Sequence, residues 1–140
     1  GARMKGGEEH RVYLPQRAMD IVNAHRGLDK RFVFATPNMD GTPMSNMAML
    51  VLLKRLGVNK QTTVHGLCRS TFSTWANETG AARPDVIEAC LAHREGDRIR
   101  AAYNRAQFVT ERKALLAKWG AYLDGTEPAS NVIPMHAKTA

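Results

Sequence analysis

The spacing of apolar residues changes near residue 64 of this 140-residue chain. Before that point, two short apolar segments flank a Gly-Gly pair within residues 3–14, a pattern typical of a β-hairpin. The run RFVFA at residues 31–35 predicts another short strand, followed by the turn-rich TPNMDGTP. After residue 64, apolar residues recur at helical spacing only. The pattern therefore predicts strands and helices in the first part and helices alone in the second.

Five segments show helical spacing, and most of them end at a glycine. They are residues 16–27, 45–57, 65–80, 83–93 and 100–125. The predicted core residues are Leu67, Phe72, Trp75, Val86, Ile87, Cys90 and Leu91, with a stripe formed by Phe108, Leu115, Leu116, Trp119, Tyr122 and Leu123. We expect an α+β fold, with a mostly helical body and a small antiparallel β-hairpin or sheet. Residues 125–140 lack periodicity, and we expect a flexible tail there.

Composition narrows the class of protein. Apolar residues make up 44% of the chain, so a globular domain is expected. Twenty Lys and Arg against 13 acids give a net charge of +7, which favours an anionic partner, nucleic acid before membrane. No membrane span or signal peptide is visible, and Cys68 and Cys90 match neither a disulfide framework nor a zinc site. We expect a cytoplasmic protein that needs no metal and no cofactor, because no cofactor-binding motif is present.

Four features could carry chemistry, although each has an ordinary structural interpretation. Lys5 flanks the glycine hairpin, where a lysine is usually only solvated. His65 and Arg69 are four residues apart and could present donors to one phosphate or form an incidental surface pair. His93 ends an apolar helix, where histidine is more often a cap than a catalyst. Tyr103 stands among small and polar residues, an unusual setting for a core aromatic.

Together these features resemble the tyrosine recombinases, specifically integrases of prophages and genomic islands. The segments that carry the resemblance are RMKGGEEHRVYLP, TVHGLCRSTFSTWANE and LAHREGDRIRAAYNRA. The family has a lysine on a hairpin seven residues before a strand valine, as Lys5 precedes Val12. It also has a His-x-x-Arg motif, then a second histidine, and a tyrosine nine or ten residues after that. The resemblance covers residues 3–124.

The resemblance implies DNA strand cleavage and rejoining through a 3′-phosphotyrosyl intermediate, without metal or ATP. Tyr103 would be the nucleophile and His65 the general base and acid. Arg69 would stabilise charge on the phosphate, His93 would donate a hydrogen bond to it, and Lys5 would protonate the leaving 5′ oxygen.

Two departures from the family pattern affect these expectations. The box reads HGLCR, so that Cys68 stands where the family's arginine usually falls and Arg69 follows one residue later. The extra residue must be absorbed in the first helical turn if His65 and Arg69 are to converge. The family's upstream catalytic arginine has no counterpart here. We therefore expect residues 1–124 to be part of a catalytic domain, and the chain alone to be weakly active or inactive.

The segment from residue 94 to residue 118 holds seven basic residues and three acids. Arg94, Arg98, Arg100 and Arg105 are candidates for contacts with the DNA backbone, whereas Arg112, Lys113 and Lys118 are expected only to solvate a helix. The partner implied by the resemblance is a double-stranded DNA attachment site, bound by a homotetramer that assembles through the helix at residues 106–123. Two alternatives stay open: a non-catalytic helix-turn-helix-like DNA-binding module, and a fragment that only oligomerises.

Overall fold

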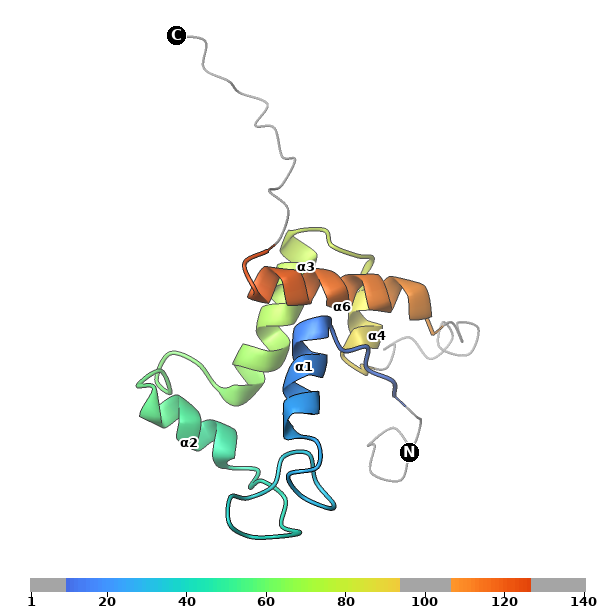
Figure 1. Cartoon of the computed structure of the whole chain (residues 1–140). Coiled ribbons are helices and arrows are strands. Elements are labelled where there is room, and N and C mark those ends of the chain that lie inside the picture. Colours follow the sequence, from blue (N-terminus) through green and yellow to red (C-terminus); the bar gives the residue numbers. More distant parts are fainter. Residues whose placement is uncertain (1–9, 94–106, 127–140) are drawn as a thin grey trace, which may run out of the picture.

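The computed structural model describes residues 10–93 and 107–126, and within these ranges the regular structure is helical. Helices α1 (Gln16–His25) and α2 (Ala48–Arg55) precede a π-helical turn, η1 (Gly66–Ser70), which continues directly into α3 (Thr71–Glu78). Helices α4 (Pro84–Cys90) and α6 (Val109–Leu123) follow (Figure 1). Helix ends follow the sequence prediction, because the glycines after α1, α2, α3 and α6 adopt positive φ angles.

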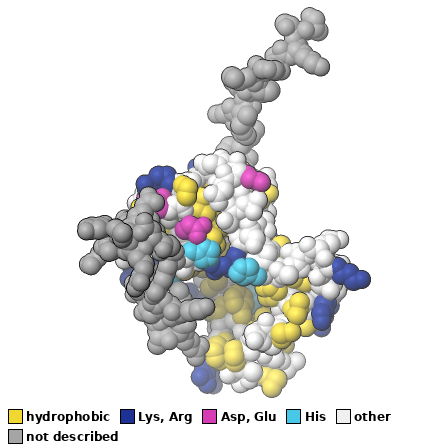
Figure 2. All heavy atoms as spheres, turned by 180° about the vertical axis from the view of Figure 1, so that it is seen from behind, with side chains coloured by type: hydrophobic (Ala, Val, Ile, Leu, Met, Phe, Trp, Pro, Cys, Tyr) yellow, Lys and Arg dark blue, Asp and Glu magenta, His cyan; other side chains and the backbone are white. Residues whose placement is uncertain are grey.

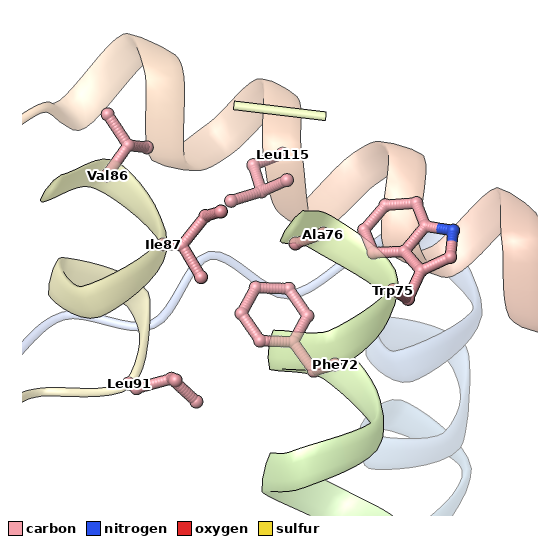
Figure 3. Packing of buried hydrophobic residues seen from close by; sticks show 7 residues of the cluster. All are labelled: Phe72, Trp75, Ala76, Val86, Ile87, Leu91 and Leu115. Atoms are coloured by element: carbon pink, nitrogen blue, oxygen red, sulfur yellow. The ribbon is translucent and has the colours of Figure 1, made fainter. Parts of the chain in front are cut away.

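The core lies where α3, α4 and α6 meet. Figure 3 shows side chains from all three helices pointing toward one another. The buried cluster consists of Phe72, Trp75, Ala76, Val86, Ile87, Leu91 and Leu115. Helix α6 crosses this layer and also contacts α1 (Figure 1). Removing apolar surface from water stabilises the folded state by about 25 cal/mol per Å². This cluster therefore holds α4 in place against α3.

Most of the predicted core residues are confirmed, and the exceptions lie at its edges. Leu67 is 44% exposed, so its assignment to the core is wrong. Tyr122 and Leu123 are also exposed, although the Tyr122 ring stacks on Trp119 with ring centroids 5.3 Å apart. The stripe therefore has one buried residue, Leu115, with Phe108, Leu116 and Trp119 partly buried beside the core and its last two residues exposed.

The predicted α+β fold is wrong: no strand occurs in residues 10–93 or 107–126. Residues 31–35 form a single isolated bridge, between Ala35 and Pro43. The N–H of Thr36 bonds to the Thr42 carbonyl and the N–H of Met44 bonds to the Phe34 carbonyl, and the pairing stops at this one bridge. The Asp29 carboxylate instead holds this loop, since it accepts hydrogen bonds from three backbone N–H groups, which lower the pKa of Asp29.

The segment predicted as the second hairpin strand is extended but packs on α6 instead of on a strand. The Arg112 guanidinium donates to the Arg11 carbonyl and lies 5.4 Å from the centroid of the Tyr13 ring. Pro15 packs so closely on Gly120 that a Cβ at position 120 would lie 2.6 Å from it. Arg112 is only 6% exposed, so the expectation that it is solvated is wrong. The first strand of the predicted hairpin lies outside the described residues.

Helix α2 stands apart from this core (Figure 1). Many of its apolar side chains are exposed. Only Leu53 of α2 is buried. The exposed apolar residues of α2 and its flanks are Met44, Met47, Met49, Val51, Leu52 and Leu56. No helix within the described ranges has the length and apolar character needed to cross a membrane.

Replacing Arg112 by alanine is expected to lower the free energy of unfolding by roughly 2 to 3 kcal/mol, because the carbonyls of Arg11 and Gln107 lose their donor in a poorly solvated place. Lys118→Ala, an exposed change on the same helix, should cost less than about 0.5 kcal/mol. Urea denaturation of both variants measures the difference. Equal stabilities for the two variants would contradict the assignment of Arg112 as the residue that joins the first segment to α6.

Candidate functional site

A pocket of about 220 Å³ lies between the η1–α3 helix and the carboxyl end of α4. Its lining residues are His65, Arg69, Ser70, Ser73, Thr74, Leu91 and His93. Figure 2 shows histidine side chains next to basic atoms and an acidic side chain on one face of the molecule. All but one of the lining residues carry polar side chains, so the pocket offers hydrogen-bonding groups to a ligand.

The π-helical turn brings His65 and Arg69 to the same pocket. The N–H of Thr71 bonds to the carbonyl of Gly66, five residues earlier, which is the hydrogen-bond pattern of a π-helix. A π turn contains one residue more than an α turn, so positions four apart in it relate to each other much as positions three apart do in an α-helix. A turn of this kind can accommodate the extra residue that the family resemblance implies for the HGLCR box, and Cys68 is exposed.

The end of α4 positions His93 through a Schellman motif. The N–H of His93 bonds to the Glu88 carbonyl at 3.0 Å, and the N–H of Ala92 bonds to the Ala89 carbonyl at 3.3 Å. This motif requires a left-handed residue, and Ala92 supplies it with a φ of 55°. Glycine is the usual residue at such a position because a Cβ is unfavourable there. The unfavourable backbone conformation of Ala92 thus turns His93 back toward α3.

Arg69 joins the two sides of the pocket. Its Nη2 donates to the Leu91 carbonyl at 2.7 Å, at the partly negative carboxyl end of α4, and contacts His93 Nε2 at 2.5 Å. The other ring nitrogen, Nδ1, lies 2.6 Å from Glu88 Oε2. Arg69, His93 and Glu88 thus form a continuous hydrogen-bonded chain that runs from η1 to α4.

His10 is a further titratable group close to this chain. Burial and the positive charges of Arg112 and Arg69 lower the pKa of His10, and a hydrogen bond with the Cys90 backbone partly offsets them. Burial raises the pKa of the Cys90 thiol, partly offset by Arg112. Neither His10 nor Glu88 was identified from the sequence. The only sequence feature that points to Glu88 is an acidic residue near the end of a predicted helix that ends at His93.

Three of the residues singled out from the sequence, His65, Arg69 and His93, line one pocket. Their catalytic roles stay predictions. Tyr103 and Lys5 lie outside the described residues, as do the four arginines expected to contact DNA, Arg94, Arg98, Arg100 and Arg105.

The chain is similar in sequence to several integrases. It is 34% identical to the prophage integrase IntA of Escherichia coli K12 over 134 residues, which are 94% of this chain and 32% of that protein. It is 37% identical to the prophage integrase IntZ of the same organism, over 86% of this chain and 30% of that protein. It is 32% identical to the integrase of Shigella phage Sf6, again over 86% of this chain and 32% of that protein.

The chain therefore spans about a third of the length of these curated relatives. No family model matches the chain. No solved structure matches it either.

Replacing Ala92 by glycine is expected to raise the free energy of unfolding by about 1 kcal/mol, since glycine adopts the left-handed conformation without a Cβ penalty. Ala89→Gly, inside α4, should have the opposite sign and a similar size. Thermal or urea denaturation distinguishes the two. A loss of stability in Ala92→Gly would show that the left-handed turn before His93 is not formed.

Proposed function

We propose that this chain, a homologue of the phage-type integrases, is part of a tyrosine-type recombinase that cleaves and rejoins DNA in site-specific integration or excision. The observation that carries the proposal is the convergence of His65, Arg69 and His93 on one small polar pocket. Sequence similarity alone would be consistent with a fragment that retains the family's helices but has lost its chemistry. The pocket favours a functional phosphate site.

The pocket offers the groups that a phosphodiester requires. The planar fork of Arg69 suits two oxygens of a phosphate. Hydroxyls of Ser70, Ser73 and Thr74 line the same space and can donate to the remaining oxygens. A phosphate placed here would meet the guanidinium and the histidines at once, an arrangement that stabilises charge as it develops in the transition state.

The proposed reaction is a phosphoryl transfer with two proton movements. The Tyr103 hydroxyl attacks the phosphorus, the bond to the 5′ oxygen breaks, and a 3′-phosphotyrosyl link forms. His65 takes the tyrosine proton, because a phenol with an ordinary pKa near 10 is a weak nucleophile. Lys5 gives a proton to the leaving 5′ oxygen. The roles of Tyr103 and Lys5 rest on the family resemblance, and attack by a 5′ hydroxyl of another strand reverses the step.

The proposed partner is a double-stranded attachment site, bound by several copies of the complete protein. Residues 1–124 would form part of its catalytic domain. Because a further arginine is expected to clamp the phosphate in the family, we propose that the chain alone cleaves slowly. The loss of one such donor typically costs about 10² to 10³ in rate.

The helix-turn-helix alternative is less consistent with α4. A recognition helix should present basic or amide side chains to the major groove. Between its first and last residues, α4 carries two acids, Asp85 and Glu88, and no basic residue. Arg83, which precedes α4, is engaged with Glu111 at 2.7 Å and lies 3.6 Å from Asp85. We therefore do not propose that α4 acts as a recognition helix in the major groove of DNA.

The test is covalent capture of the chain on DNA. The substrate is a pool of nicked duplexes of randomised sequence in which the bridging 5′ oxygen at one position is sulfur, because a thiolate leaves without help from an acid. We expect a denaturation-resistant adduct that disappears in Tyr103→Phe, and that Arg69→Ala reduces about 100-fold or more. Filter binding of the same duplexes should be unchanged in Tyr103→Phe. An adduct that persists in Tyr103→Phe, or DNA binding without any adduct, would contradict the proposal.

A further inference from the structure

Glu88 is the one member of the hydrogen-bonded chain that the proposed mechanism does not use. It holds His93 at two points: its backbone carbonyl accepts the His93 N–H at 3.0 Å, and its carboxylate lies 2.6 Å from His93 Nδ1. The side chains of both residues are about half exposed, at 48% and 47%. The carboxylate can therefore act on the imidazole without being buried itself.

The contacts of His93 define its protonation state in the absence of a ligand. A guanidinium has donors only, so the Arg69 Nη2 contact requires an unprotonated Nε2. The proton of the neutral ring then lies on Nδ1, where it is donated to Glu88. In this state His93 presents an acceptor to the pocket and has no N–H to offer a phosphate.

A phosphate in the pocket changes what His93 must do. Arg69 would turn from His93 toward the anion, and a phosphate oxygen near Nε2 would require an N–H there. Moving the ring proton from Nδ1 to Nε2 would leave two acceptors, Nδ1 and the Glu88 carboxylate, facing each other. The arrangement that satisfies both sides is the imidazolium, which donates from Nδ1 to Glu88 and from Nε2 to the anion.

We propose that Glu88 is a positioning residue that lets His93 change from an acceptor for Arg69 to a doubly protonated donor when a tetrahedral oxyanion enters the pocket. The inference rests on the proposed function, because it assumes that this pocket holds the phosphate. The proton comes from the solvent. Among residues 10–93 and 107–126, the charged groups that face His93 are Arg69 from η1 and Glu88 from α4, with His65 on the same pocket and His10 near Arg69.

The test uses the full chain with histidine and arginine labelled by ¹⁵N, and inorganic sulfate as the oxyanion, because sulfate does not titrate near neutral pH. Ring ¹⁵N shifts report which nitrogens carry a proton. Without sulfate, we expect a proton on Nδ1 and none on Nε2. With sulfate, we expect protons on both nitrogens, and uptake of about one proton per sulfate in calorimetry across buffers of different ionisation enthalpy.

Three variants separate a role in protonation from a role in folding. Glu88→Gln keeps an acceptor for Nδ1–H but removes the negative charge, so the ligand-free tautomer of His93 should persist. The protonation of His93 by sulfate should be lost in this variant, and sulfate should bind about tenfold more weakly. Glu88→Ala should likewise lose sulfate-induced protonation, while the Arg69 contact still keeps Nε2 unprotonated without sulfate. Glu78→Gln, an exposed acid at the end of α3, changes the net charge equally and should behave as the wild type does.

The outcomes distinguish the two proposals. If sulfate shifts Arg69 and His65, and His93 gains its second proton equally in Glu88→Gln, the role of Glu88 is wrong and the phosphate pocket stands. A second proton on His93 with sulfate in Glu88→Ala, equal to that in the wild type, would also overturn it. If sulfate perturbs neither Arg69 nor His93 in the wild type, the pocket is not a phosphate site, and both proposals fail.

Discussion

The arrangement of the site depends on Arg69 reaching the carboxyl end of α4. Its guanidinium bridges the Leu91 carbonyl and the His93 ring, and thereby joins two helices that otherwise meet through apolar contacts. The position of α4 is set by the same core that places α3, with Phe72 and Ala76 on one side and Val86 and Ile87 on the other (Figure 3). Packing of the apolar side chains thus brings η1 close to the carboxyl end of α4, and the contacts of Arg69 hold the two in that position.

Two local departures from regular helix geometry shape the pocket. The π turn at η1 places Arg69 on the same pocket as His65, and the left-handed Ala92 turns His93 back over the end of α4. Both conformations are unfavourable relative to a regular helix followed by a glycine. Unfavourable local geometry that persists next to polar, ligand-sized space is typical of functional sites.

Helix boundaries and most of the core could be predicted from the sequence, because glycines with positive φ and the spacing of Phe72, Val86 and Leu115 are local signals. The sheet could not. The pairing near Ala35 stops at one bridge, and residues 11–15 pack against α6 through Arg112, a long-range contact without a local signature. Candidate residues were found by resemblance, whereas the role of Glu88 needed the geometry of the helix end.

The central claim is that His65, Arg69 and His93 together bind the phosphate on which Tyr103 acts. A crystal structure of the chain grown with tungstate, a heavy tetrahedral oxyanion, tests it most directly. The claim predicts a strong anomalous peak in the pocket, with oxygens within hydrogen-bond distance of Arg69 and His93 and the contact between those two side chains broken. Tungstate bound elsewhere on this basic protein, with the Arg69–His93 contact intact and the pocket empty, would contradict it.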